Sequence, residues 1–333
     1  MNIILAILIF TFLVLIHELG HFLTAKFLKV RAYELSLGMG PKIFGKKHND
    51  TEYTLRALPF GAYVRFGDED DSMFEESDNF MNQSPWDRIK IIMMGPLVNM
   101  VAALILMILV VFLSGVPVNK IGSVAADMPA AAAGLRAGDE ILEVEGAPTS
   151  SWEDVVKAID ANSDDTISVI VQREGQQAQT IEITPTLSEG RMMIGITPAF
   201  EKNLGQSVIS GTKATLNMST MMLDIVKKLF TGKADISSFS GPVGIVAIVD
   251  DVAATGWINL LYLTSVLSLN LGILNLLPIP GLDGSKILIY GFEALSGKPM
   301  NKDIEMKLTM VGFAVLLAFT IFVTFKDITR LIG

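Results

Sequence analysis

The sequence contains no cysteine among its 333 residues, and it is poor in charged side chains. The absence of cysteine excludes a disulfide framework, a thiolate nucleophile and a metal site built from cysteines alone. Charged residues make up 18% of the chain, against about 25% in typical soluble domains, and half of all residues are hydrophobic. The net charge of −9 argues against a nucleic acid as partner. The composition therefore predicts a membrane protein.

Four stretches are long and apolar enough to cross a bilayer, which takes roughly 20 mostly apolar residues. They are 2–23, 91–116, a segment within 252–282, and 308–325. A secretory signal peptide is the competing interpretation of the first stretch, and it predicts a basic start and a small-residue cleavage site. The chain has no Lys or Arg before Lys26, and no such site follows the apolar run. We therefore predict a polytopic α-helical membrane protein with four transmembrane helices.

Basic residues near the ends of the spans predict the orientation, because cytoplasmic loops carry an excess of Lys and Arg. They flank the end of the first span and the start of the second, and they recur between the third and fourth. We therefore expect 26–90 and 285–307 to be cytoplasmic, and both termini and 117–251 to lie outside. Lys326 and Arg330 in the tail weakly oppose this orientation.

Three segments between the spans have patterns of their own. Residues 51–65 combine aromatic and β-branched residues with a Pro-Phe-Gly turn and predict a short cytoplasmic β-hairpin, whereas 37–41 read as a loop or re-entrant corner. Residues 205–230 predict a helix, either at the outer membrane interface or packed as a connector on the neighbouring soluble module.

That soluble module covers residues 121–199. Its pattern predicts a helix at 152–161 capped by Ser151, and strands at 166–173 and 179–184 joined by a Glu-Gly turn. With the run Gly-Leu-Arg-Ala-Gly-Asp-Glu-Ile-Leu at 134–142, the module resembles a PDZ domain. Such α+β domains bind extended chain ends by adding a strand to the edge of a sheet.

The sharpest chemical signal is His17-Glu18-Leu19-Gly20-His21, inside the first span. Positions i and i+4 share one face of a helix, so both imidazoles can reach one zinc ion, with Glu18 as general base. Two histidines satisfied within a helix bundle are the plainer alternative. Ionisable groups are costly at membrane depth, however, and they usually mark function there.

A hydrolytic zinc site needs a third protein ligand. His48 is a poor candidate because it lies in a polar turn, Lys46 to Asp50. Asp283 is better placed, since it ends a long uncharged stretch just after Pro278 and Pro280, which interrupt a helix. The alternative for Asp283 is an interface residue or turn former.

Together these motifs resemble the site-2 protease family of intramembrane zinc metalloproteases (family M50), and within it the bacterial RseP-like branch. The resemblance rests on HELGH, Gly95-Pro96 with Asn99, the PDZ-like module, FSGPVG at 239–244 and NLLPIPGLDG at 275–284. It departs from the best-known members in having room for only one PDZ domain, and in having Ser285 where a second glycine is usual.

The resemblance implies that His17, His21 and Asp283 bind Zn²⁺, that Glu18 is catalytic, and that Asn270 and Asn275 bind substrate. Implied substrates are single-span membrane proteins in the lipid bilayer, such as anti-sigma factors after a first cleavage and remnant signal peptides. Their cleavage would belong to regulated intramembrane proteolysis at the bacterial plasma (inner) membrane. The PDZ part would exclude bulky substrates, and the hairpin would pair with the substrate as an added strand.

The implied organisation inserts an extracytoplasmic PDZ domain into a membrane protease domain. Its parts are 1–116 (first and second spans with the hairpin), 117–200 (PDZ domain), 201–251 (interfacial or connector helix region) and 252–333 (third and fourth spans with the Asp283 motif). Two other functions compete: a membrane-bound zinc protease that cuts soluble proteins, and a non-enzymatic metal transporter or scaffold. A transporter is disfavoured because the sequence shows no internal repeat.

Overall fold

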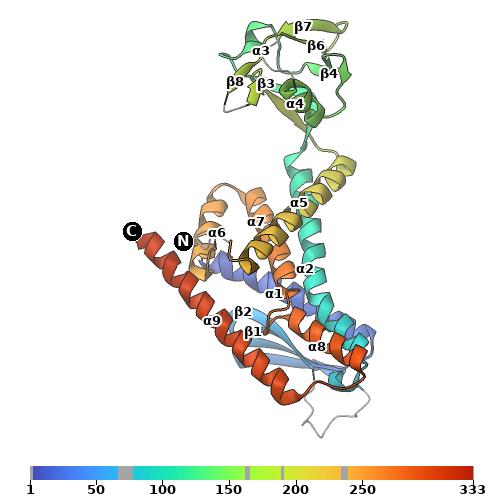
Figure 1. The fold of residues 1–333 in the computed structure, drawn as a ribbon, viewed down its shortest axis with the longest axis vertical. Coiled ribbons are helices and arrows are strands. Elements are labelled where there is room, and N and C mark those ends of the chain that lie inside the picture. Colours follow the sequence, from blue (N-terminus) through green and yellow to red (C-terminus); the bar gives the residue numbers. More distant parts are fainter. Residues whose placement is uncertain (1–2, 67–77, 162–165, 189–190, 234–238, 333) are drawn as a thin grey trace. The chain divides into compact units, whose positions relative to one another are not determined.

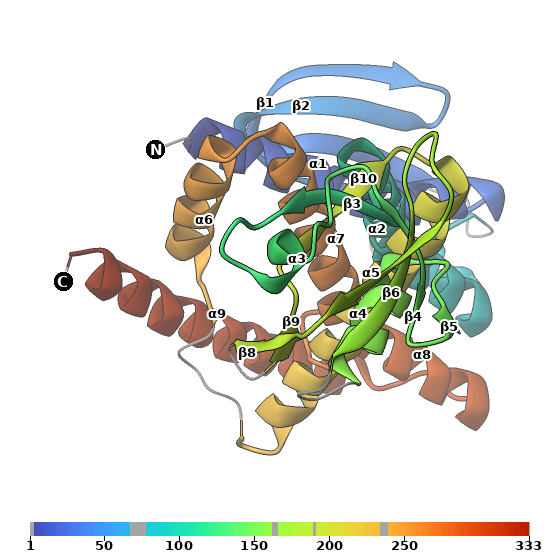
Figure 2. The same cartoon turned by 90° about the horizontal axis from the view of Figure 1, so that it is seen from above.

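The structure is a computed structural model that describes residues 3–66, 78–161, 166–188, 191–233 and 239–332. The chain forms two compact units, 1–110 together with 211–333, and 111–210. Figure 1 shows the elements of each unit, and Figure 2 shows them from above.

Among the described residues, four helices are long and apolar enough to cross a membrane, as the sequence predicts. They are α1 (Ile3–Phe27), α2 (Pro85–Ser114), α7 (Trp257–Asn275) and α9 (Lys302–Ile332). In the most apolar 18-residue stretch of each of these helices, only 11–33% is buried by the rest of the protein. Apolar surface of this extent is stable only when lipid covers it, so the chain is a helical membrane protein.

Helix α1 packs against two other helices of its unit. Its buried residues Ala6, Ile9 and Leu13 pack with Val249 of α6 (Pro242–Ala254) and with leucines of α7. Helix α6 is not predicted from the sequence, and at 13 residues it is shorter than a span needs. Its N-terminus is capped from α9, where the buried Asp327 carboxylate accepts hydrogen bonds from the backbone N–H groups of Gly241 and Gly244, both at 2.8 Å.

Strands β1 (Ala32–His48) and β2 (Thr51–Phe66) form a larger sheet than the predicted hairpin. Residues 42–48 face 51–56 across the hairpin, and residues 34–37 lie opposite both 52–55 and 62–65. The prediction of a loop at 37–41 is wrong, because β1 continues through it, with positive φ at Gly38 and Gly40. Sheet and helix are in contact where the Thr11 hydroxyl of α1 donates to the Pro59 carbonyl of β2 at 3.0 Å (Figure 2).

Two further helices complete this unit, α5 (Leu204–Phe230), which begins in the other unit, and α8 (Asp283–Ser296). The predicted helix at 205–230 is confirmed as α5. Met218 and Met222 of α5 pack against Ala103 of α2 and Leu269 of α7. This part of α5 therefore packs on apolar helices, rather than on the soluble module as one of the two interpretations has it.

The unit 111–210 is built on a sheet with strand order β10-β3-β4-β6-β7. Its elements are β3 (Val116–Val124), α3 (Pro129–Ala132), β4 (Glu140–Val144), β5 (Ala147–Pro148), α4 (Trp152–Asp160), β6 (Ile167–Gln172), β7 (Gln179–Ile183), β8 (Thr186–Ser188), β9 (Arg191–Met193) and β10 (Ile196–Glu201). The predicted α4 is confirmed with its Ser151 capping box, as is the antiparallel pair β6–β7. Branched side chains of β4, α4 and β6 form the core, Ile141, Val155 and Val169 among them.

One buried ion pair joins the loop before β4 to the end of β6. The Asp139 carboxylate accepts hydrogen bonds from Nε and Nη2 of Arg173, each at 2.7 Å, and from the Arg136 N–H at 3.0 Å. Hydrogen bonds from Arg173 hold the pKa of Asp139 below its ordinary value, although burial opposes this.

Replacing Asp139 with Asn should therefore loosen this unit. We expect the amides of β4 and β6 to exchange with solvent roughly 10- to 100-fold faster at neutral pH, because charge-assisted hydrogen bonds are lost. Because the pKa of Asp139 is lowered in the folded protein, its ionised carboxylate stabilises the fold at pH values above the ordinary carboxyl pKa of 3.8. This stabilisation is lost as the pH falls below that value. The difference between wild type and Asp139→Asn should accordingly shrink toward pH 3.

Hydrogen exchange of the full-length protein, followed by mass spectrometry, measures this effect. The matched control is Glu153→Gln, which removes an exposed pair with Lys157 on α4 and should change exchange less than about twofold. Equal effects of the two substitutions would contradict the role given to Asp139.

Candidate metal centre

Two of the three predicted ligands project from one face of α1. His17 and His21 are one helical turn apart, and both are buried. Their rings meet edge to face, with centroids 4.7 Å apart. The helix thus brings two imidazole nitrogens together, with Nε2 to Nε2 at 3.2 Å.

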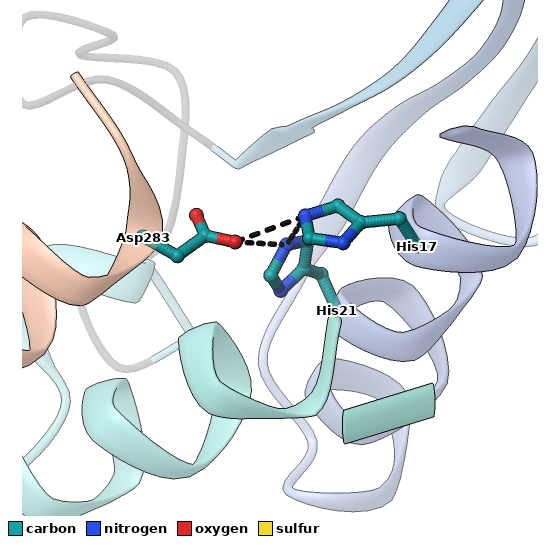
Figure 3. Close-up of side chains that lie close together, drawn as sticks. All are labelled: His17, His21 and Asp283. Atoms are coloured by element: carbon teal, nitrogen blue, oxygen red, sulfur yellow. Dashed lines mark hydrogen bonds and ion pairs between the residues drawn. The ribbon is translucent and has the colours of Figure 1, made fainter. Parts of the chain in front are cut away.

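The third predicted ligand comes from the opposite part of the chain. After α7 ends at Asn275, the backbone turns through Pro278 to Pro280, and α8 begins at Asp283. Its carboxylate faces the two histidines, with Oδ2 2.9 Å from Nε2 of His17 and 3.4 Å from Nε2 of His21 (Figure 3). The structure therefore brings Asp283 together with His17 and His21, which lie far earlier in the sequence.

The spacing of the three atoms fits a metal better than a hydrogen-bonded cluster. Oδ2 of Asp283 is buried and makes no hydrogen bond of good geometry, despite its short distance to His17. Ligands at about 2.05 Å from a tetrahedral zinc lie about 3.3 Å from one another. The observed separations of 2.9, 3.2 and 3.4 Å are close to that value. Two imidazoles and a carboxylate are also a donor set that zinc accepts.

Helix α2 lies directly against this cluster. The Ile91 carbonyl oxygen lies 2.9 Å from Nδ1 of His21, and the Asn99 amide lies 3.4 Å from Nδ1 of His17. Between them, Gly95 leaves room for the rings, because a Cβ there would overlap the imidazole of His21. A Cβ on Gly20 of α1 would likewise overlap the backbone of Met94. Glycine on both helices therefore permits the close approach that the site requires.

Glu18 is held by the sheet. Its Oε2 accepts a hydrogen bond from the Val64 backbone N–H of β2 at 3.0 Å, and its side chain is partly buried. Glu18 does not belong to the cluster of ligand atoms, which leaves its carboxylate available for proton transfer. The backbone of β2 thus fixes the position of the predicted catalytic base.

The remaining candidates lie apart from the cluster. Asn270 and Asn275 are half-buried on α7, and within the described part of the chain neither side chain has a hydrogen-bond partner. His48 is exposed at the end of β1 and is not part of the cluster.

Sequence reasoning did not identify Val64 or Ile91 as contacts of the site. Both contribute backbone atoms, for which a sequence carries no residue-specific signal. Gly20 and Gly95 do carry a signal, because each is a glycine inside a helix that would otherwise favour a larger residue.

Comparisons with known proteins identify a family and several relatives of this chain. The model of the family described as Peptidase family M50 matches residues 5–319. A Clostridium acetobutylicum protein named as a zinc metalloprotease is 35% identical over 98% of this chain and 97% of its own length. The Regulator of sigma-W protease RasP of Bacillus subtilis is 32% identical over 98% of this chain and 97% of its own. A zinc metalloprotease RasP of Bacillus licheniformis is 30% identical over 99% of this chain and 100% of its own length.

A solved structure also resembles part of the chain. The PDZ domain of an SdrC-like protein from Listeria monocytogenes is 30% identical and covers 26% of this chain and 88% of its own, with a TM-score of 0.22.

The close packing of α1 and α2 predicts the effect of one added methyl group. Gly95→Ala should displace the His21 ring and weaken zinc binding at least tenfold, because ligand geometry is lost. Competition with a chromophoric chelator measures the affinity of the purified full-length protein. The control is Gly291→Ala in α8, where a Cβ meets no atom within 4 Å, and its zinc affinity should stay within about twofold of wild type. Unchanged affinity in Gly95→Ala would show that the helices need not approach so closely.

Proposed function

This chain belongs to peptidase family M50, and on that basis we propose that it cleaves the transmembrane segments of other proteins within the bilayer. It is a zinc metalloendopeptidase. The observation that carries the proposal is the meeting of two histidines on an apolar, membrane-length helix with a carboxylate from a distant helix.

In the proposed site His17, His21 and Asp283 hold the zinc ion. Zinc bound in this way supplies a more acidic water molecule and polarises the scissile carbonyl. Three protein ligands, rather than four, are the number that would let the ion also bind a water molecule, as in hydrolytic zinc sites.

Glu18 is the proposed general base. It follows the first ligand directly on α1, and its carboxylate is held by the Val64 N–H rather than by a cation. It would take a proton from the attacking water and deliver it to the leaving amine.

The substrate class follows from where these groups lie. From Ile3 to His17, α1 rises about 21 Å at 1.5 Å per residue, so the site lies toward the C-terminal end of this span. A peptide bond in a helix is shielded by its own hydrogen bonds, so the substrate must unwind before it is cut. Strand β2 offers an edge that could pair with the unwound segment. Asn270 and Asn275, whose amides have no hydrogen-bond partner among the described residues, would bind its backbone.

The surroundings of the site complete the proposal. The basic residues next to the spans support a cytoplasmic position for 26–90 and 285–307, with both termini and the PDZ domain, 117–200, outside a bacterial plasma membrane.

The described part of that domain has a groove between α4 and residues 192–198, lined by Trp152, Val156 and Met193 among others. Acting as a size filter, the domain would admit only substrates already trimmed by another protease.

The name of the Bacillus subtilis relative, Regulator of sigma-W protease, connects that protein with a sigma factor. We extend this to anti-sigma factors and remnant signal peptides as substrates of the present chain, in regulated intramembrane proteolysis. The scaffold and transporter alternatives do not require a carboxylate beside the metal ligands. A protease for soluble proteins does not require its ligands on a membrane-length helix.

Replacing Glu18 with Gln tests the chemistry. We expect at least a hundredfold loss of cleavage of a detergent-solubilised spanning peptide, because the general base is removed, with zinc content unchanged. The measurement pairs product analysis by mass spectrometry with zinc determination on the same sample. Asp283→Asn serves as the comparison and should lose zinc as well as activity. Full activity of Glu18→Gln would overturn the proposed role, and cleavage of casein at equal rate would overturn the substrate class.

The need to unwind the substrate predicts a sequence preference. A spanning peptide with Gly, Pro, Ser or Asn near its centre should be cut at least tenfold faster than a uniform poly-Leu span of equal length. Helix interiors lose roughly 1 kcal/mol with Gly and 3 kcal/mol with Pro, relative to Ala. Equal initial rates for the two peptides, at matched incorporation into the same micelles, would contradict this mechanism.

A further inference from the structure

Asn99 of α2 has a position that the proposed mechanism does not use. Its side chain is fully buried, and its amide nitrogen lies 3.4 Å from Nδ1 of His17. Its carbonyl oxygen Oδ1 is also buried and has no hydrogen-bond partner among the described residues. A buried amide oxygen without a hydrogen-bond partner is unfavourable, because it has lost its contact with water, so this arrangement calls for an explanation.

The tautomer of His17 supplies the explanation. Its Nε2 faces Asp283 and His21, so it is the nitrogen that would bind zinc. A neutral imidazole that binds a metal through Nε2 carries its proton on Nδ1 and needs an acceptor there. The Asn99 Nδ2 group is a donor, so donor would face donor. The nitrogen and oxygen of an amide have the same shape, and rotating the group by 180° turns Oδ1 toward the Nδ1–H.

The second histidine has the same kind of support. Nδ1 of His21 lies 2.9 Å from the Ile91 carbonyl oxygen, which can only accept, so this Nδ1 carries the proton and Nε2 is free for the metal. Ile91, Gly95 and Asn99 follow one another at i, i+4 and i+8 along one face of α2. That face thus offers an acceptor to each imidazole, with a gap for the rings between them.

Asn99 is itself held in place by α7. Its backbone carbonyl accepts a hydrogen bond from the Ser268 hydroxyl at 2.8 Å, and the Ser265 hydroxyl bonds the Ala103 carbonyl one turn further along at 2.7 Å. A Cβ on Gly272 would overlap the Pro96 carbonyl, so α7 and α2 are in close contact here. This support fixes the position from which the Asn99 side chain reaches His17.

We propose that Asn99 is a positioning residue for the zinc ligand His17, accepting a hydrogen bond from its Nδ1–H through Oδ1 when the metal is bound. The inference rests on the proposed function, since it takes His17 Nε2 as a zinc ligand. It assigns to α2 the orientation of both imidazoles, one by a backbone oxygen and the other by a side-chain oxygen.

Zinc affinity tests the role without relying on catalysis. Chelator competition is performed on full-length protein carrying Glu18→Gln, in detergent. Asn99→Leu keeps the branched shape of the side chain but removes the acceptor, and it should weaken zinc binding 10- to 100-fold. Asn99→Asp restores an acceptor and should stay within about threefold of the parent. Thr264→Val removes a hydroxyl of α7 that donates to the Leu260 carbonyl of the same helix at 2.8 Å, so it serves as the control and should stay within about twofold.

The proposal is overturned if Asn99→Leu binds zinc as tightly as the parent, or if the control Thr264→Val weakens binding as much as Asn99→Leu does. His17→Ala separates this result from failure of the proposed function. If His17→Ala loses zinc while Asn99→Leu does not, the metal site stands and the positioning role falls. Unchanged affinity in His17→Ala would overturn both.

A second measurement needs no substitution at Asn99. The chain has only three histidines, so ¹⁵N-histidine labelling of the zinc-bound protein gives few signals. We expect two histidines with protonated Nδ1 that exchanges slowly with solvent, corresponding to His17 and His21. A rapidly exchanging or deprotonated Nδ1 on His17, identified by its loss in His17→Ala, would overturn the proposal even if Asn99→Leu fails to fold.

Discussion

The convergence of the Asp283 carboxylate on two imidazoles of α1 is the interaction on which the rest of the structure depends. Two buried imidazoles and a half-buried carboxylate at this depth would be costly to leave unpaired, and they come from distant parts of the chain. The fold must therefore hold α8 against α1. A buried ion pair contributes to this, because the Arg88 guanidinium at the start of α2 lies 2.6 Å from the Glu293 carboxylate of α8. Arg88 also lies over the Tyr290 ring at 4.4 Å.

Helix α2 supports the site from the other side. Its glycine allows α1 to approach, its Ile91 carbonyl faces one imidazole, and its Asn99 amide faces the other. Since α7 is hydrogen-bonded to the same stretch through two serines, a small shift of α7 would be felt at the histidines. The site is thus maintained by contacts between helices as much as by the residues that would bind the metal.

The sequence predicts what depends on local pattern. Hydropathy locates the four apolar helices, and the i, i+4 spacing puts His17 and His21 on one face. The prolines before Asp283 indicate that a helix must begin anew there. What the sequence does not reveal depends on the path of the backbone. The Val64 N–H reaches Glu18 only because β2 folds against α1, and the extent of the sheet depends on a register that runs through two glycines with positive φ. Helix α6 has no clear signal in the sequence, because its 13 residues are too few for a span and its apolar run is interrupted by Asp250 and Asp251.

Electrostatics gives a reason for a carboxylate as the proposed third ligand. A charge that is not balanced is expensive in a medium of low dielectric constant, so a site within a bilayer should be close to neutral with its metal. Two neutral imidazoles with Asp283 and the nearby Glu18 contribute two negative charges, which match the two positive charges of zinc. A third histidine would leave a net positive charge at the same depth. The residue types at positions 17, 18, 21 and 283 therefore meet two requirements at once. They provide the ligands and the base that a zinc peptidase needs, and they keep the site close to neutral, as a medium of low dielectric constant demands.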